Sequence, residues 1–266
     1  MTLVDKQHKL HLHDALGNGG PASEDVATDF ITPNDVFFVR NHAPVPQVDP
    51  ASFRLRVGGS VANALSLSLD ALRQRYEPHT VTATLQCAGN RRKQLVSYRA
   101  VDDGLAWDVE AIGTARWTGV RLADVLRSAG VDAEQARHVA FLGLDQVAHT
   151  DAHGQPYHEP YGSSIELEKA LTPDVLLAYE MNGEPLPPAH GAPLRVVVPG
   201  YIGARSVKWL AEISVQAQPS ANYYQQVAYK LFTPDVREET VNYDAGMMIT
   251  RFPVNSAIVR PGHGAR

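Results

Sequence analysis

The sequence predicts an α+β fold: a single compact domain of several mixed β-sheets with surrounding short helices. Its expected strands and helices do not alternate regularly along the chain, as they would in a doubly wound parallel sheet. The 266 residues contain neither the glycine-rich dinucleotide-binding motif nor the phosphate-binding P-loop. Eighteen prolines and twenty glycines, spread along the chain, indicate short elements joined by many loops.

Two segments have the apolar spacing of short amphipathic helices. They cover residues 68–76 and 118–130. In the second segment, four apolar side chains fall on one face: Leu122, Val125, Leu126 and Ala129. Gly130 then makes a plausible helix C-cap, because glycine takes the left-handed conformation that commonly ends a helix.

Five further segments predict strands because they are rich in β-branched and other apolar residues. These segments are 80–86, 138–145, 174–186, 194–200 and 207–216. The third contains Asn182-Gly183, a dipeptide that strongly favours a two-residue hairpin turn.

The first 30 residues are expected to form a mobile or loosely docked arm, since residues 17–25 have the composition of a loop. Charged and histidine residues stand where a signal peptide would carry its apolar stretch. We find no run of about 18 apolar residues that would predict a membrane span. The prediction is a cytoplasmic protein, with export after loss of a cleaved leader left open.

Composition narrows the function classes. A formal net charge of −5 argues against a general nucleic-acid binder, which usually carries a basic excess. A hydrophobic content of 44% and a charged content of 20% are typical of an ordinary globular protein. The single cysteine cannot form an internal disulfide, so the fold does not depend on oxidising surroundings.

That cysteine, Cys87, lies in the stretch TLQCAGNRRK, at the end of a predicted strand. A free cysteine is most often a buried, inert small hydrophobe. A strand end entering a Gly-Asn loop is, however, a place where functional groups are displayed. Arg91 and Arg92 would favour the thiolate if they fold back near the sulfur.

A thiolate serves as a nucleophile or as a ligand of a soft metal. The stretch matches no cysteine-hydrolase signature. The chain has eleven histidines, however, so a histidine base near the cysteine stays an open alternative. One thiol cannot build a zinc ribbon or an iron–sulfur cluster. The remaining hypothesis is a soft metal that is bound by this thiolate and whose other ligands are not protein groups.

Seven motifs lie in order between Phe37 and Ile258. They are FFVRNHAPVP (37–46), TLQCAGNRR (84–92), TARWTGVRLADVL (114–126), YGSSIELEKAL (161–171), LLAYEMNGEPLPPAHGAPLRVVVPGYIGARSVKWL (176–210), YYQQVAYKLF (223–232) and PVNSAI (253–258). In these motifs and in their order the chain resembles the molybdenum-cofactor domain of the sulfite oxidase family, whose nitrate reductase relatives share the fold. The implied fold is that of the family's molybdopterin domain.

The resemblance implies a site. Cys87 matches the cysteine that binds molybdenum, and four residues match the substrate pocket: Arg40, Arg92, Trp107 and Tyr229. Planar guanidinium groups suit a small dianion such as sulfite. The cofactor, one molybdenum-molybdopterin per chain, would be held by twelve residues. These are Phe38, Val39, Arg40, Asn41, His42, Asp145, His190, Arg195, Arg205, Ser206, Val207 and Lys208.

The implied activity is oxidation of sulfite to sulfate by oxygen-atom transfer, with electrons passed to an external acceptor such as a cytochrome. No haem domain is expected. Residues 31–258 would form the catalytic domain and residues 259–266 a tail, without the immunoglobulin-like dimerisation domain of many relatives, so a monomer is one expectation. Three alternatives stay open: a nitrate-reductase-like domain, a protein that binds cofactor or oxyanion without turnover, and a metal-free cysteine-nucleophile enzyme.

The segment 147–162 contains three histidines outside these motifs: His149, His153 and His158. Their spacing is not a recognised helical metal-binding pair. A solvated loop is the favoured interpretation, and a metal site the alternative.

Overall fold

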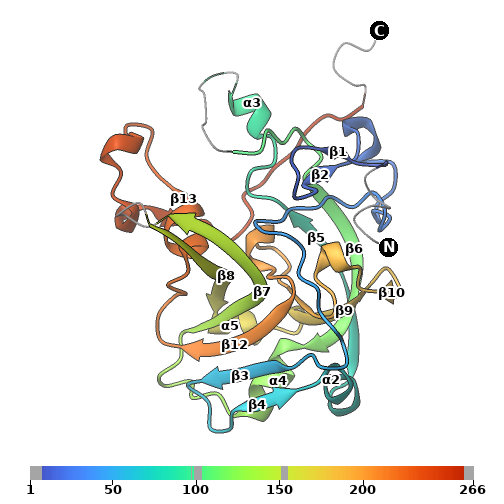
Figure 1. The fold of residues 1–266 in the computed structure, drawn as a ribbon, viewed down its shortest axis with the longest axis vertical. Coiled ribbons are helices and arrows are strands. Elements are labelled where there is room, and N and C mark those ends of the chain that lie inside the picture. Colours follow the sequence, from blue (N-terminus) through green and yellow to red (C-terminus); the bar gives the residue numbers. More distant parts are fainter. Residues whose placement is uncertain (1–7, 97, 99–103, 151–154, 261–266) are drawn as a thin grey trace.

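A computed structural model describes residues 8–96, 98, 104–150 and 155–260. Two five-stranded sheets form the body, with few short helices around them (Figure 1). The α+β class predicted from the sequence is therefore confirmed. No helix in this described part is long and apolar enough to cross a lipid bilayer.

The first sheet has the strand order β10-β9-β6-β5, and β11 also pairs with β9. Its strands are β5 (Pro78–Gln86), β6 (Ile112–Arg121), β9 (Leu176–Met181), β10 (Glu184–Pro185) and β11 (Arg195–Val197). All of its strand pairs are antiparallel. The predicted hairpin turn joins β9 to β10, and both Asn182 and Gly183 have the positive φ that this turn requires.

The second sheet has the order β4-β3-β12-β7-β8. Its strands are β3 (Leu55–Gly59), β4 (Leu65–Leu67), β7 (His138–Thr150), β8 (Pro156–Glu166) and β12 (Leu210–Gln216). Only β12 and β3 run parallel, so the sheet is mixed. Strands far apart in the sequence thus lie side by side, which brings the middle and the end of the chain together (Figure 1).

Helices α2 (Leu69–Arg75) and α4 (Leu122–Ala129) lie near β3 and β4 in the lower part of Figure 1. Ser68 caps α2, because its hydroxyl accepts a hydrogen bond from the Ala71 N–H. The four predicted apolar residues of α4 are buried in the larger core cluster. Gly130 ends α4 at φ 71°, as the sequence predicted.

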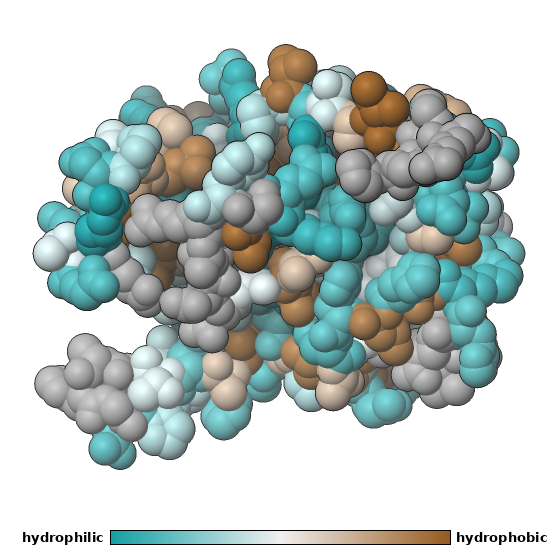
Figure 2. Space-filling model, turned by 90° about the horizontal axis from the view of Figure 1, so that it is seen from above, coloured by the Kyte–Doolittle hydropathy of each residue, from teal (hydrophilic) through white to brown (hydrophobic). Residues whose placement is uncertain are grey.

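The remaining elements are short and lie mostly in the connections. They are β1 (His11–Leu12), β2 (Gly19–Gly20), η1 (Ser23–Asp25), α3 (Arg92–Val96), α5 (Leu167–Ala170), η2 (Pro188–His190), η3 (Gly203–Arg205), η4 (Tyr224–Ala228), β13 (Lys230–Leu231), η5 (Glu238–Thr240), η6 (Tyr243–Ala245) and β14 (Met247–Met248). On the face seen from above, hydrophobic residues form separate patches among hydrophilic ones (Figure 2).

Three expectations need correction. The helix predicted at 118–130 begins only at Leu122, because residues 118–121 continue β6 and pair with β5 and β9. Residues 147–150 and 156–162 belong to strands β7 and β8 rather than to a solvated loop. The arm is not loosely docked between Leu10 and Gly20, where Asn18 and Gly19 are buried and β1 pairs with β2.

The histidines of segment 147–162 do not assemble into a site. His149 pairs with Tyr157 and Ala148 with His158, so His149 and His158 point to opposite faces of the hairpin. His153 lies outside the described residues. Within the described ranges, no group of three or more His, Cys, Asp or Glu side chains is placed to hold a metal ion.

Gly119 marks the tightest contact between β6 and β9, where the register shifts. A Cβ at this position would lie 2.0 Å from the Leu177 carbonyl oxygen. We expect Gly119→Ala to lower the free energy of unfolding by about 1–3 kcal/mol, because the backbone must move apart. Gly58→Ala is the matched control, since its added Cβ meets nothing within 4 Å. Denaturant unfolding of both variants measures the difference, and equal effects would contradict this account.

Candidate functional site

A pocket lies where the two five-stranded sheets meet. Its empty volume is about 670 Å³, part of which is open to solvent. Its wall is built from strand ends and from the loops between them. The lining residues are Phe37, Phe38, Arg40, Asn41, His42, Leu85, Cys87, Ala88, Asp145, Tyr161, His190, Arg195, Gly203, Ala204, Ser206, Lys208, Trp209 and Tyr229. Both sheets and both halves of the chain therefore contribute to one site.

Cys87 follows directly after β5, and its backbone N–H donates to the Ala111 carbonyl at the end of the paired strand. The Gly89 N–H points at the sulfur, with N and Sγ 3.4 Å apart. Burial raises the pKa of the Cys87 thiol, while the charges of Arg40 and Arg92 act in the opposite direction. The arginine charges favour the thiolate, but burial has the larger effect on the pKa of Cys87. A cation at the sulfur would favour the thiolate.

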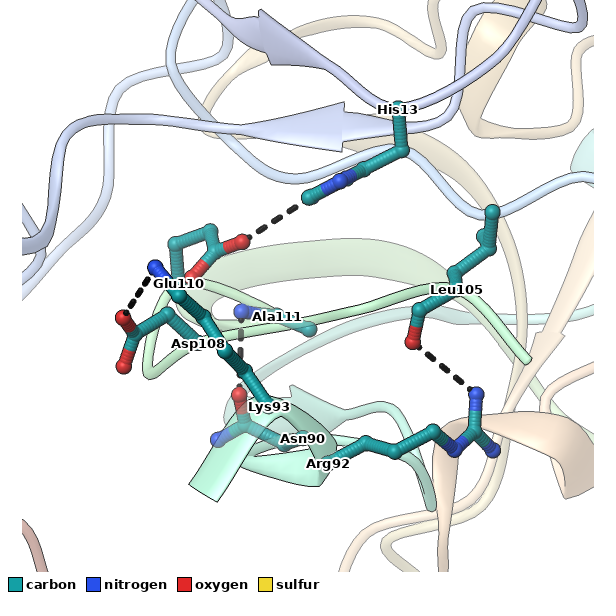
Figure 3. A network of polar contacts seen from close by, with 8 residues as sticks. All are labelled: His13, Asn90, Arg92, Lys93, Leu105, Asp108, Glu110 and Ala111. Atoms are coloured by element: carbon teal, nitrogen blue, oxygen red, sulfur yellow. Dashed lines mark hydrogen bonds and ion pairs between the residues drawn. The ribbon is translucent and has the colours of Figure 1, made fainter. Parts of the chain in front are cut away.

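The two arginines after Cys87 point in different directions. Arg92 donates to the Leu105 carbonyl at 3.0 Å and packs against Gly89 and Gly104, where a Cβ would lie 2.8 and 2.7 Å from its guanidinium (Figure 3). Arg91 instead reaches Gln94 and the carbonyl of Ser256. Only Arg92 therefore stays with the cysteine loop.

Figure 3 shows the polar contacts that hold this loop. Asn90 Oδ1 accepts from the Ala111 N–H at 3.1 Å, and Lys93 pairs with Asp108 at 3.2 Å. His13, from the N-terminal segment, contacts Glu110 at 3.0 Å. The loop is thus tied to the residues that precede β6, and these residues also contact the N-terminal segment.

His42 and Tyr229 form a hydrogen-bonded pair, with the ring Nε2 and the phenol oxygen 3.0 Å apart. Burial, together with the positive charges of Arg40 and Lys208, holds the pKa of His42 well below its usual value. Burial raises the pKa of Tyr229 to about 12. At neutral pH the pair is therefore a neutral imidazole and a phenol, so the phenol can donate and the imidazole can accept.

An aromatic cluster supports this pair. The His42 ring stacks on Tyr161 at 4.7 Å between centroids and contacts Tyr224 at 4.2 Å. Tyr161 is itself fixed, because its hydroxyl donates to the Ala204 carbonyl at 2.9 Å. Tyr224 opens the π-helical turn η4, which leads directly into Tyr229. Such turns frequently occur at functional sites.

Two cations, Arg195 and Lys208, line the pocket. Arg195 is 4% exposed, and burial lowers its pKa to about 9, so it stays charged at neutral pH. Its guanidinium donates to the carbonyls of His190 and Ser206. Lys208 donates to the side-chain oxygen of Asn41 and to the Ala189 carbonyl. The hydrogen bonds of Arg195 go to neutral carbonyl oxygens, so its positive charge favours an anion in the pocket.

Asp145, in β7, is the pocket's buried carboxyl. Burial raises its pKa to about 6, with the Lys208 charge acting against the shift. Its Oδ1 has no hydrogen-bond partner in the structure. A buried carboxyl oxygen without a partner is suited to accept an N–H from a bound heterocycle.

The structure brings most of the predicted site residues to the pocket wall. These are Phe38, Arg40, Asn41, His42, Cys87, Asp145, His190, Arg195, Ser206, Lys208 and Tyr229. Five predicted residues lie outside the wall: Val39, Arg92, Trp107, Arg205 and Val207. The roles assigned to all of them remain predictions.

The five residues outside the wall have distinct environments. The side chains of Val39 and Val207 are buried in core clusters, so only their backbones can serve a ligand. Trp107 is completely buried, and its indole N–H has no hydrogen-bond partner. The Arg205 guanidinium donates to Ser163, Gln225 and the Ile249 carbonyl, so it already binds the protein.

Sequence reasoning missed several wall residues, namely Phe37, Leu85, Ala88, Tyr161, Gly203, Ala204 and Trp209. Tyr161 and Trp209 lie inside motifs already quoted above. Their direction depends on sheet pairing, however, and residue type alone does not give it.

Asp145 gives a prediction for the cofactor-free protein. Since its folded pKa is raised from 3.8 to about 6, stability is lost as the pH rises through this window. Asp145→Asn removes the ionisation, so it should be more stable than the wild type at neutral pH, by at most roughly 3 kcal/mol. The gain should grow from pH 4 to pH 6 and then stay constant.

Denaturant unfolding across this pH range measures the gain. Asp70→Asn makes the same exchange at an exposed carboxylate of α2 and is the control. A stability difference between Asp145→Asn and wild type that is constant with pH would contradict the raised pKa.

Comparison with known proteins adds the family. Residues 42–224 match the oxidoreductase molybdopterin binding domain family. The chain is 51% identical to sulfite oxidase of Gallus gallus over 252 residues, which are 93% of this chain and 53% of that protein. It is 49% identical to mitochondrial sulfite oxidase of Homo sapiens over 253 residues, 93% of this chain and 44% of that protein. The chain thus spans about half the length of these relatives.

Two further matches are more distant. Nitrate reductase [NADPH] of Emericella nidulans is 39% identical over 245 residues, 88% of this chain and 27% of that protein. Among solved structures, the sulfane dehydrogenase SoxCD from Paracoccus pantotrophus superposes with a TM-score of 0.77 at 25% identity, covering 96% of this chain and 60% of that one. The fold of the described residues is therefore that of a known oxidoreductase.

Proposed function

The chain belongs to the oxidoreductase molybdopterin binding domain family, which it shares with the sulfite oxidases, and from this we propose that it oxidises sulfite to sulfate. The reaction would use one molybdenum-molybdopterin per chain and no haem of the chain's own. Sulfite and water give sulfate, two protons and two electrons, so an external acceptor such as a cytochrome must take the electrons. When bound, the cofactor would supply this two-electron chemistry and the oxygen transfer.

The observation that carries the proposal is the placement of Cys87. The chain's only thiol lies in the wall of the pocket, close enough to Arg40 and Arg92 for both charges to act on it. A soft thiolate suits a molybdenum centre whose other ligands are not protein groups. The same two arginines would hold a small dianion beside that sulfur.

The other pocket residues fit the rest of the cofactor. Arg195 and Lys208 supply the positive charge that a terminal phosphate needs. The unpartnered Oδ1 of Asp145 fits an N–H of the pterin ring. Its raised pKa also allows a protonated carboxyl, which could instead donate to a ring nitrogen.

Residues near the sulfur would orient and neutralise the substrate. Arg40 and Arg92 would bind sulfite oxygens and favour its dianion. The Trp107 N–H, buried and without a partner, would add a donor. Tyr229 would donate its phenol proton to an anion oxygen when the His42 tautomer with N–H at Nε2 donates to the phenol oxygen. Such preorganised donors stabilise developing charge without reorganising during the reaction.

Two expectations from the sequence stay predictions. The cytoplasmic location is one, and the human relative is named as a mitochondrial protein. The monomeric state is the other. A nitrate-reductase-like reaction remains the alternative activity, and the similarity to the nitrate reductase of Emericella nidulans supports it.

Metal analysis combined with two assays tests the function. We expect one molybdenum per chain and turnover with sulfite and ferricyanide, without turnover of nitrate by reduced viologen. Because Cys87 is the only protein thiol, Cys87→Ser should largely abolish sulfite oxidation while pterin stays bound. Full activity in Cys87→Ser would refute the ligand role, and nitrate turnover alone would select the alternative.

Neighbouring arginines provide a matched test of substrate binding. Arg92→Gln should raise the KM for sulfite by roughly 10- to 100-fold, because a charge-assisted contact to the anion is lost. Arg91→Gln should leave KM near the wild-type value, since Arg91 binds Gln94, Asn255 and Ser256 instead. Loss of molybdenum from Arg92→Gln with KM unchanged would assign Arg92 to the cofactor.

A further inference from the structure

The N-terminal segment 14–20 pairs directly with the pocket segment 39–42. Gly19 and Val39 exchange two backbone hydrogen bonds, of 3.1 and 2.8 Å. Asn18, which has no exposed surface, continues this pairing with its side chain. Its Nδ2 donates to the Asn41 carbonyl at 3.0 Å, and its Oδ1 accepts from the Asn41 N–H. One side-chain amide therefore satisfies both backbone groups of Asn41.

Asp14 fixes the orientation of that amide. One oxygen of Asp14 accepts from the backbone N–H groups of Leu16 and Asn18, at 2.9 and 3.1 Å. The other accepts from Asn18 Nδ2 at 2.6 Å. With two acceptors at its nitrogen and one donor at its oxygen, the amide of Asn18 has only one satisfactory orientation.

Asn41 links this segment to the cations of the pocket. Its carbonyl accepts a second hydrogen bond, from the guanidinium of Arg40. Its side-chain oxygen accepts from Lys208, and its side-chain nitrogen donates to the Leu16 carbonyl at 3.2 Å. The position of Asn41 thus sets the acceptors that hold both Arg40 and Lys208.

We propose that Asn18 is a positioning residue: it holds Asn41, and through Asn41 it places Arg40 and Lys208 in the pocket. The N-terminal segment is then a part of the site and not an appendage of the domain. This inference rests on the proposed function only for the identity of the ligands. The contacts themselves do not depend on it.

The physical reason is the burial of Asn41, which is 1% exposed. Without Asn18, its N–H would lose its partner inside the protein, and its carbonyl would keep only the bond from Arg40. A buried unsatisfied group is costly, so the backbone would turn toward water or another partner. That rotation would move the oxygens on which Arg40 and Lys208 depend.

The test compares Asn18→Ala with Asn34→Ala in the cofactor-loaded protein. Asn34 is also a buried asparagine, but its amide donates to Met181 and Glu184, neither of which lines the pocket. Both variants should unfold more easily than the wild type. Only Asn18→Ala should release pterin faster, on the order of tenfold, and raise the KM for sulfite.

Hydrogen exchange supplies a readout independent of turnover. In Asn18→Ala, the amides of residues 39–42 should exchange faster, on the order of tenfold, in both loaded and cofactor-free protein. Asn34→Ala should leave them at the wild-type rate. If the wild type binds pterin but does not oxidise sulfite, the proposed function fails, while pterin release and exchange still decide the role of Asn18.

A double variant isolates the key bond. Asp14→Asn combined with Asn18→Asp keeps a donor and an acceptor between these two positions, but a carboxylate at 18 cannot donate to the Asn41 carbonyl. The carboxylate still accepts from the Asn41 N–H, so exchange at residue 41 and pterin release should lie nearer the wild type than in Asn18→Ala. Pterin release and exchange in Asn18→Ala that match Asn34→Ala would overturn the proposal.

Discussion

The structure depends most on two buried guanidinium groups that have no carboxylate partner among the described residues. Arg195 donates to the carbonyls of His190, Val196 and Ser206, and thereby joins η2, β11 and the chain after η3. Arg205 joins β8, η4 and the chain directly after β14. Burying a charge costs several kcal/mol unless it is paired, so such cations persist where function requires them. The chain carries a net charge of −5, so a general excess of positive charge does not explain why these two cations are buried.

The site lies between two apolar clusters of the core. One contains Phe141 and Ile213 of the second sheet. The other contains Trp117 of the first sheet, with Trp107 and Cys87 from the connection between β5 and β6. Low polarity on both sides strengthens every charge that faces the pocket. This explains why burial dominates the pKa shifts of Cys87 and Asp145 even though cations lie nearby. A metal cation bound at the sulfur would lower the pKa of the Cys87 thiol, because it favours the thiolate.

Local signals in the sequence predicted much of the fold. The turn at Asn182-Gly183, the cap at Gly130 and the strand before Cys87 all follow from residue type and spacing. Pairing across the fold could not be predicted in this way. Residues 118–121 have a helical pattern, yet hydrogen bonds to strands on both sides keep them extended. The arm likewise resembles a loop until Gly19 meets Val39, a contact that local sequence does not specify.

The cysteine loop shows that spacing in the sequence does not predict the direction of a side chain. Arg91 and Arg92 are adjacent, but Arg91 adopts φ 67°, a left-handed conformation that costs about 1–3 kcal/mol outside glycine. This turn directs Arg91 outward, to Asn255 and Ser256, while Arg92 stays beside Gly89. The Arg91 N–H gains a bond to the Asp108 carbonyl that helps to offset the strain. The strained turn at Arg91 therefore separates two guanidinium groups that are adjacent in the sequence, and only that of Arg92 stays in the cysteine loop.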